Sequence, residues 1–128
     1  MADSMNTSVW ADLVVALLSV NNYPAERTYK LLDALGNAGL AEPDKLASFS
    51  EEEIARKLCA AGYKRGVFLT GVFAERLAAL GRFVRAHGRE QCEPILEGQD
   101  YERVRTLLSS VKGIGPTVVK TFIALRRS

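Results

Sequence analysis

Residues that build catalytic and metal centres are scarce in this chain of 128 residues. It has one histidine, His87, and two cysteines, Cys59 and Cys92. We therefore expect neither a histidine-based catalytic triad nor a zinc site, and His87 stands where it would cap the end of a helix rather than catalyse. The two cysteines have neither metal-ligand spacing nor the density of a disulfide scaffold, which favours structural thiols in a reducing compartment.

Long apolar runs are also missing. Residues 13–20 are apolar, but this stretch is too short to span a bilayer, follows Asp3 and Asp12, and lacks the basic region of a secretory signal. The sequence therefore predicts a soluble intracellular protein without membrane partners. We expect it in the cytoplasm, associated with the nucleoid if the source is bacterial or archaeal.

The composition and the apolar periodicity favour one helical domain. Hydrophobic residues make up 48% of the chain and charged residues 25%, which is typical of a globular protein. Apolar residues recur at helical spacing, and no alternating run is long enough to indicate a strand. We predict an all-α fold of about six to eight helices, with residues 1–128 forming a single domain.

Residues that start and stop helices divide the first half of the chain. Ser8 predicts the cap of a helix over residues 9–20, and Pro24 predicts the start of a second helix that runs to Gly36 or Gly39. Pro43 opens a short turn of helix. The sequence Ser-Glu-Glu-Glu at residues 50–53 is a capping box for a helix that stops at Gly62.

A long amphipathic helix is predicted next, over about residues 65–86. Its expected buried side comprises Phe68, Val72, Leu77, Leu80, Phe83 and Val84. We predict a polar connection over residues 88–91 and a short helix over residues 94–96. Asp100 or a neighbour would then cap the last helical pair.

The last helical pair, at about residues 102–127, has the pattern of a helix-hairpin-helix. An apolar segment leads into Gly113-Ile114-Gly115, and Pro116 suits the first position of a new helix. Glycines allow a ligand to approach the backbone closely, and the start of a helix attracts anions, so we expect contact with DNA phosphates. Ile114 should point inward. A plain helix cap followed by another helix would give the same pattern.

The distribution of charge favours a polyanionic partner. Residues 101–128 contain six basic side chains and one acidic side chain, Glu102, although the whole chain has a net charge of only +2. Residues 56–89 contain eight basic residues and one acid, Glu75. Clustered Lys and Arg indicate nucleic-acid binding, although charge runs also occur on solvated helix faces.

Over nearly its whole length the chain resembles the helix-hairpin-helix (HhH-GPD) superfamily of DNA glycosylases, of the endonuclease III type. Residues 17–22 are similar to the first core helix of that family and the loop after it. Residues 61–65 are similar to its Gly-Leu-Tyr-Asn loop, and residues 111–116 match its hairpin. The resemblance implies base-excision repair and sequence-independent binding of double-stranded DNA, including lesion or abasic DNA. The DNA-binding residues that it implies are Lys112, Gly113, Ile114, Gly115, Thr117, Lys120, Asn21, Asn22, Tyr63, Lys64 and Arg65.

The resemblance also implies roles for particular atoms. The side chain of Asn21 would enter the gap left by a flipped base, with Asn22 and Tyr63 as further wedge candidates, although ordinary packing is the alternative for Tyr63. The glycine N–H groups of the hairpin would bind phosphate. The main-chain carbonyls of Ser109, Val111 and Ile114 would hold a monovalent cation, K⁺ or Na⁺.

Three departures from the family pattern argue against catalysis. Thr117 stands where bifunctional members have a nucleophilic lysine, and threonine cannot form a Schiff base. The catalytic aspartate of the family lies about two helical segments beyond the hairpin, and the sequence ends before that point. The four-cysteine iron–sulfur cluster of many relatives is also missing, so we expect no such cofactor.

Three hypotheses follow. The first is a DNA-binding module that is either non-catalytic or requires a partner. The second is a minimal glycosylase or AP lyase that uses an unrecognised acid such as Asp12 or Asp33, with Lys120 as an outside candidate for the nucleophile. The third is a protein-interaction scaffold, or an incomplete family member, that forms a homodimer or binds another protein through an exposed apolar face.

Overall fold

The computed structural model describes residues 8–20 and 23–127, and these residues are helical without a strand. The all-α prediction is confirmed, with nine helices in this part of the chain where six to eight were expected. They are α2 (Val9–Leu18), α3 (Ala25–Tyr29), α4 (Leu32–Asn37), α5 (Pro43–Ser48), α6 (Glu51–Ala60), α7 (Val67–His87), α8 (Arg89–Glu97), α9 (Tyr101–Ser109) and α10 (Pro116–Arg127).

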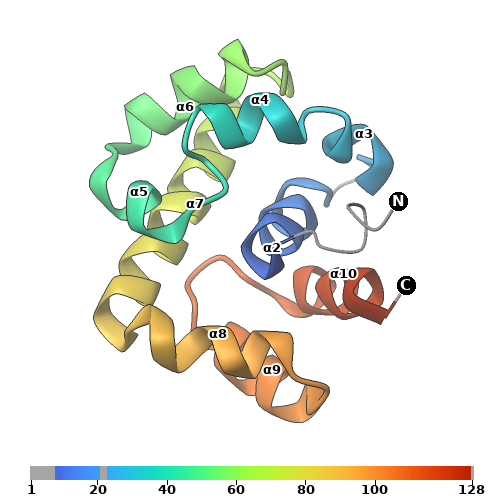
Figure 1. Ribbon diagram of the computed structural model, residues 1–128. Helices are drawn as coiled ribbons and strands as arrows, with labels where there is room; N and C mark the ends of the chain where they lie inside the picture. The colour runs from blue at the N-terminus through green and yellow to red at the C-terminus, as the bar shows by residue number, and fades with distance from the viewer. Residues whose placement is uncertain (1–7, 21–22, 128) are drawn as a thin grey trace.

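Helix α2 is the central element of the fold. All ten of its residues are buried, and the Ser8 side chain caps its start by accepting from the Trp10 N–H. The helix packs against α3, α7 and α10. The intervening helices run around it before α10 returns to its side (Figure 1). The first and last helices of the described chain thus share one core.

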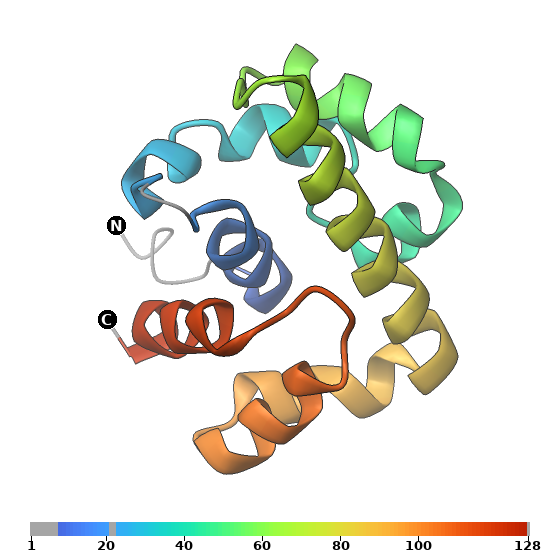
Figure 2. The same ribbon diagram turned by 180° about the vertical axis from the view of Figure 1, so that it is seen from behind.

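Helix α7 is the longest element, and its other main neighbours are α5 and α6. The contact with α5 depends on Gly81, because a Cβ atom there would lie 2.5 Å from the backbone nitrogen of Ala47. Only a residue without a side chain allows the two backbones to approach so closely. In Figure 2, α7 runs beside the connection between α9 and α10.

Local sequence signals placed several helix ends correctly. The Ser50 hydroxyl accepts from the Glu53 N–H at 3.1 Å, as the capping box predicts. Helix α6 ends at Ala60 with Ala61 as its cap, Gly62 follows with a φ of +101°, and the Tyr63 N–H donates to the Leu58 carbonyl at 2.9 Å. This is a Schellman ending. Asp100 caps α9 by accepting from the Arg103 N–H at 3.3 Å.

Other expectations about the helices were wrong. The predicted helix after Pro24 is two helices, α3 and α4, with a break at Lys30 and Leu31. The predicted connection over residues 88–91 is shorter, because α8 already begins at Arg89. Phe68 is 79% exposed rather than buried. The buried stripe of α7 passes through Leu77, and nine residues at 100° each put Phe68 on the opposite side of the helix.

No helix in the described residues combines the length and the apolar character needed to cross a membrane.

Candidate nucleic-acid interface

The predicted hairpin joins α9 to α10 through residues 110–115. Within it, the Val111 N–H donates to the Leu108 carbonyl at 3.0 Å, and the Ile114 N–H donates to the Val111 carbonyl at 3.1 Å. The side chains of Val111 and Ile114 are only 3% and 6% exposed. Because these two side chains anchor the turn in the core, the backbone at Gly113 and Gly115 faces outward.

The two glycines of the turn have different roles. Gly113 has a φ of +91°, and a Cβ atom there would lie 2.6 Å from Cγ of Arg76 on α7. A glycine is therefore required at this position for two reasons: the backbone is left-handed, and the Arg76 side chain packs too closely for a Cβ atom. Gly115 lies outside the left-handed region, and a Cβ atom there would meet nothing within 4 Å. Its surroundings are open to a ligand.

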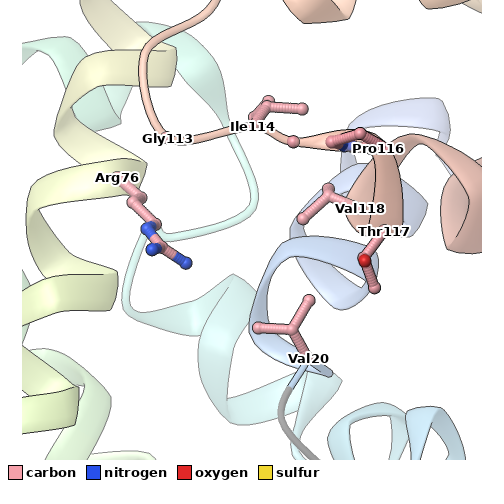
Figure 3. Close-up of a pocket in the computed structure, with 8 residues that line it drawn as sticks. Val20, Arg76, Gly113, Ile114, Pro116, Thr117 and Val118 are labelled. Carbon is pink, nitrogen blue, oxygen red and sulfur yellow. The ribbon is translucent and has the colours of Figure 1, made fainter.

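A pocket of about 450 Å³ lies between this turn, α7 and the end of α2. We call it the hairpin pocket. Its lining residues are Val20, Arg76, Gly113, Ile114, Gly115, Pro116, Thr117 and Val118. In Figure 3 the guanidinium of Arg76 extends from α7 into the space in front of the turn. The pocket therefore has one cationic side chain and an otherwise neutral lining among the described residues.

The start of α10 contributes main-chain donors to this pocket. Pro116 is the first residue of the helix and has no N–H, while the Val119 N–H donates to the Gly115 carbonyl at 3.2 Å. The N–H groups of Thr117 and Val118 lie in the first turn, where a helix offers them no acceptor. Together with the positive end of the helix dipole, they give the pocket the character of an anion site.

Arg76 is a functional candidate that the sequence alone did not single out. Its guanidinium carbon lies 5.5 Å from the centre of the Phe73 ring, and its aliphatic part covers Gly113. These two contacts fix the side chain toward the hairpin. Its only sequence signal was membership of the basic stretch over residues 56–89, which does not indicate which of eight basic residues approaches the turn.

Two predicted lysines of the hairpin point to different places. Lys112 is exposed beside Gly113, as a phosphate contact requires. Lys120 is also exposed, but it lines a separate groove between α9 and α10, together with Arg105 and Arg127. Thr117 lines the hairpin pocket and Lys120 does not. The structure therefore separates Lys120 from Thr117, the residue that the resemblance places at the position of the nucleophile.

The loop over residues 61–65 differs from the expectation. Tyr63 is completely buried, and its hydroxyl donates to the Leu18 carbonyl at 2.6 Å. Its ring lies 5.1 Å from that of Tyr23 and 5.9 Å from that of Phe73. Tyr63 cannot insert into DNA from this position, so its assignment as a wedge was wrong and the packing alternative holds.

Arg65 is engaged within the protein rather than pointing freely outward. Its Nη1 donates to the Val20 carbonyl at 3.3 Å and to the Tyr63 hydroxyl at 3.1 Å, and its guanidinium lies 4.8 Å from the centre of the Tyr23 ring. Arg65 thus holds the end of α2 against the loop. Lys64 remains exposed and available to a phosphate. Asn21 and Asn22 lie outside the described residues.

The predicted cation site fits the turn in part. The Val111 carbonyl already accepts from the Ile114 N–H, but a carbonyl oxygen has two lone pairs and keeps one for an ion. The Ser109 and Ile114 carbonyls belong to the end of α9 and to the same turn. A monovalent ion at these three oxygens therefore stays a prediction. Within the described residues, no group of three or more His, Cys, Asp and Glu side chains could hold a metal.

The two candidate acids lie away from the hairpin pocket. Asp12 is 5% exposed and accepts from the Tyr29 hydroxyl at 2.6 Å and from Arg126 at 2.7 Å, so it is committed to the core. Asp33 is exposed on α4 and does not line the pocket.

The family models, curated proteins and solved structures compared with this chain include no match to it.

Proposed function

We propose that this protein binds the phosphate backbone of double-stranded DNA through the hairpin pocket, without reading base sequence and without cleaving a bond. The observation that carries the proposal is the convergence of Arg76, the bare backbone at Gly115 and the first turn of α10 on one pocket. A phosphodiester is an anion of the kind that a guanidinium and main-chain N–H groups bind together.

Sequence independence follows from the kind of donor. Contacts to phosphate position a protein on a duplex and carry no base information. The resemblance to helix-hairpin-helix glycosylases adds the expectation of a role in base-excision repair, with tighter binding to abasic or damaged DNA. It also implies a K⁺ or Na⁺ ion at the hairpin. We further propose a cytoplasmic location, in association with the nucleoid if the source is bacterial or archaeal.

The absence of catalysis is proposed from the lining of the pocket. Cleavage of a glycosidic bond passes through a positively charged sugar, which needs a nearby carboxylate or a nucleophile. Thr117 is not an amine, and the described residues that line the pocket include no carboxylate. Arg76 would also destabilise a developing positive charge. Binding is therefore the activity that this pocket supports best.

The first experiment compares Gly115→Ala with the wild type. Because the added methyl group meets no atom of the protein, it should leave the fold intact and obstruct only a ligand at the turn. Gly36→Ala, at another glycine with open surroundings on α4, is the matched control. Fluorescence anisotropy would measure binding to an intact duplex and to one with a central abasic analogue, over a series of salt concentrations.

The proposal expects wild-type affinity to fall with salt along a straight log–log line. It also expects Gly115→Ala to lose at least tenfold in affinity, about 1.4 kcal/mol, while Gly36→Ala keeps its affinity. Wild-type protein that fails to bind either duplex at low salt would overturn the proposed function. Equal affinities for Gly115→Ala and the wild type would show that DNA does not bind at the hairpin pocket.

One observation favours a second candidate, the interaction scaffold. Val67 and Phe68 are 95% and 79% exposed, and they are neighbours at the start of α7. Adjacent exposed apolar side chains often mark a protein contact. Light scattering after size exclusion tests this candidate. A dimer that Phe68→Ser converts into a monomer would support it, and a wild-type monomer would contradict self-association.

A further inference from the structure

A second, smaller pocket also has Arg76 in its lining. It has a volume of about 240 Å³ and runs between the middle of α7 and the hairpin turn. We call it the α7 groove. Its charged lining residues are Arg76, Arg82, Lys112 and Glu75, which give a formal net charge of +2. The groove is therefore suited to an anion.

The cations of the α7 groove can turn toward a ligand at low cost. The nearest carboxylate oxygen to the Arg82 guanidinium belongs to Glu51 at 4.0 Å, and both side chains are more than half exposed. A pair of this kind contributes little to stability. Lys112 is exposed at the turn. Binding of a phosphate would replace weak contacts with charge-assisted hydrogen bonds.

The α7 groove is continuous with the hairpin pocket. Arg76 and Gly113 line both, so the two pockets adjoin at the contact between these residues. A guanidinium has five N–H donors and can serve two acceptors at once. Arg76 and Arg82 are six residues apart on α7, or about 9 Å along its axis. One strand of a duplex advances about 3.4 Å along its axis for each phosphate. The separation of the two arginines therefore exceeds the advance for one phosphate.

We propose that the α7 groove is a second phosphodiester site, which binds a phosphate of the same DNA strand that enters the hairpin pocket. This inference rests on the proposed function and adds a direction to it. The strand passes across Gly113 onto α7. It does not follow α10 toward the groove that contains Lys120 and Arg127.

The test removes two charges from each of two places. The double variant Arg82→Gln/Lys112→Gln empties the α7 groove of two cations and leaves Arg76 to the hairpin pocket. The control Arg103→Gln/Arg127→Gln removes two exposed cations from α9 and α10, outside both pockets. Both variants have the same net charge, so long-range attraction to DNA falls equally. Circular dichroism would check that each is folded.

The second site predicts that the α7-groove variant lowers the slope of log affinity against log salt by about 1 to 2. Its affinity at 0.1 M salt should fall by roughly tenfold for each phosphate that the groove no longer binds, whereas the control should change the slope by less than about 0.5. Equal decreases in affinity for the two variants would show diffuse attraction and overturn the inference. Unchanged binding by the α7-groove variant would overturn it as well.

Methylphosphonate substitution identifies the phosphates directly, because it neutralises one backbone position at a time. We expect two sensitive positions close together on one strand, and sensitivity at one of them should disappear in the α7-groove variant. A single sensitive position that depends on Gly115 would leave the proposed function intact and reject the second site. Failure of the wild type to bind any duplex would reject both.

Discussion

Arg126 of α10 donates to Asp12 of α2 at 2.7 Å, although 114 residues separate them in the chain. The Tyr29 hydroxyl donates to the other carboxylate oxygen of Asp12 at 2.6 Å. Burial, followed by the hydrogen bond to Asp12, raises the pKa of Tyr29 well above its usual range. This cluster joins α2, α3 and α10, so one of the basic residues of the C-terminal segment serves the fold rather than DNA.

Asp12→Asn should destabilise the protein by about 3 kcal/mol, because removing one member of a buried ion pair leaves the other without compensation. This value is at the lower end of the usual range for breaking a buried ion pair, since the Arg126 side chain is 26% exposed. Urea unfolding followed by circular dichroism would measure the change. Glu102→Gln breaks the exposed pair with Arg105 and should cost less than about 1 kcal/mol. Similar destabilisation in both variants would contradict the special role of Asp12.

Gly81→Ala should also destabilise the protein, by about 1 to 3 kcal/mol, because the new methyl group would overlap the backbone of α5. Gly71 lies on the same helix, and a Cβ atom there meets nothing within 4 Å. Gly71→Ala should therefore stabilise α7 by up to about 1 kcal/mol through helix propensity. Thermal melts of the two variants should move in opposite directions. A Gly81→Ala melt at or above that of the wild type would refute the close approach of α5 and α7.

Local signals in the sequence predicted the elements better than the contacts between them. Ser8, Ser50 and Asp100 act on backbone groups within three residues, so their caps could be read from the chain. The fate of Tyr63 depended on Leu18, which is 45 residues away. The approach of Arg76 to Gly113 likewise depends on how α7 packs beside the hairpin. The turn of the candidate site was therefore predictable, and its main cation was not.

Phe68 shows a further reason why the prediction failed. Its apolar side chain and its place in a long amphipathic segment favoured the core. The buried face of α7 is set by its packing on α5 and α6, however, and Phe68 lies on the side of the helix opposite to Leu77, which belongs to that face. Apolar character alone could not distinguish the two sides.

Tyr63 should make stability fall at alkaline pH. Burial raises the pKa of its phenol to about 12 in the folded protein, against the lowering effect of Arg65, whereas the ordinary value is 10.0. The folded state therefore holds this proton more tightly than the unfolded state. Its contribution to stability is complete below about pH 10 and is lost as the pH rises toward 12.

Urea unfolding at pH 8, 10 and 11.5 would measure this effect. Tyr63→Phe should be less stable at pH 8 by about 1 kcal/mol, because it lacks the hydrogen bond to Leu18. It should then lose less stability than the wild type between pH 10 and 11.5, and Tyr29 and Cys92, whose pKa values burial also raises, contribute to the remaining loss. The same decrease in both proteins would show that Tyr63 does not contribute to the alkaline transition.

Lys120 should not react with abasic DNA. It lines the groove with Arg105 and Arg127. The residue of α10 that lines the hairpin pocket where the resemblance expects a nucleophile is Thr117. An amine must come within about 3 to 3.5 Å of the sugar carbon to attack it. Borohydride treatment of the complex with an abasic duplex should therefore leave no covalent product. The control is Thr117→Lys, which puts an amine into the pocket and tests whether trapping can occur there. A wild-type adduct that Lys120→Ala abolishes would restore the lyase hypothesis and contradict the non-catalytic function.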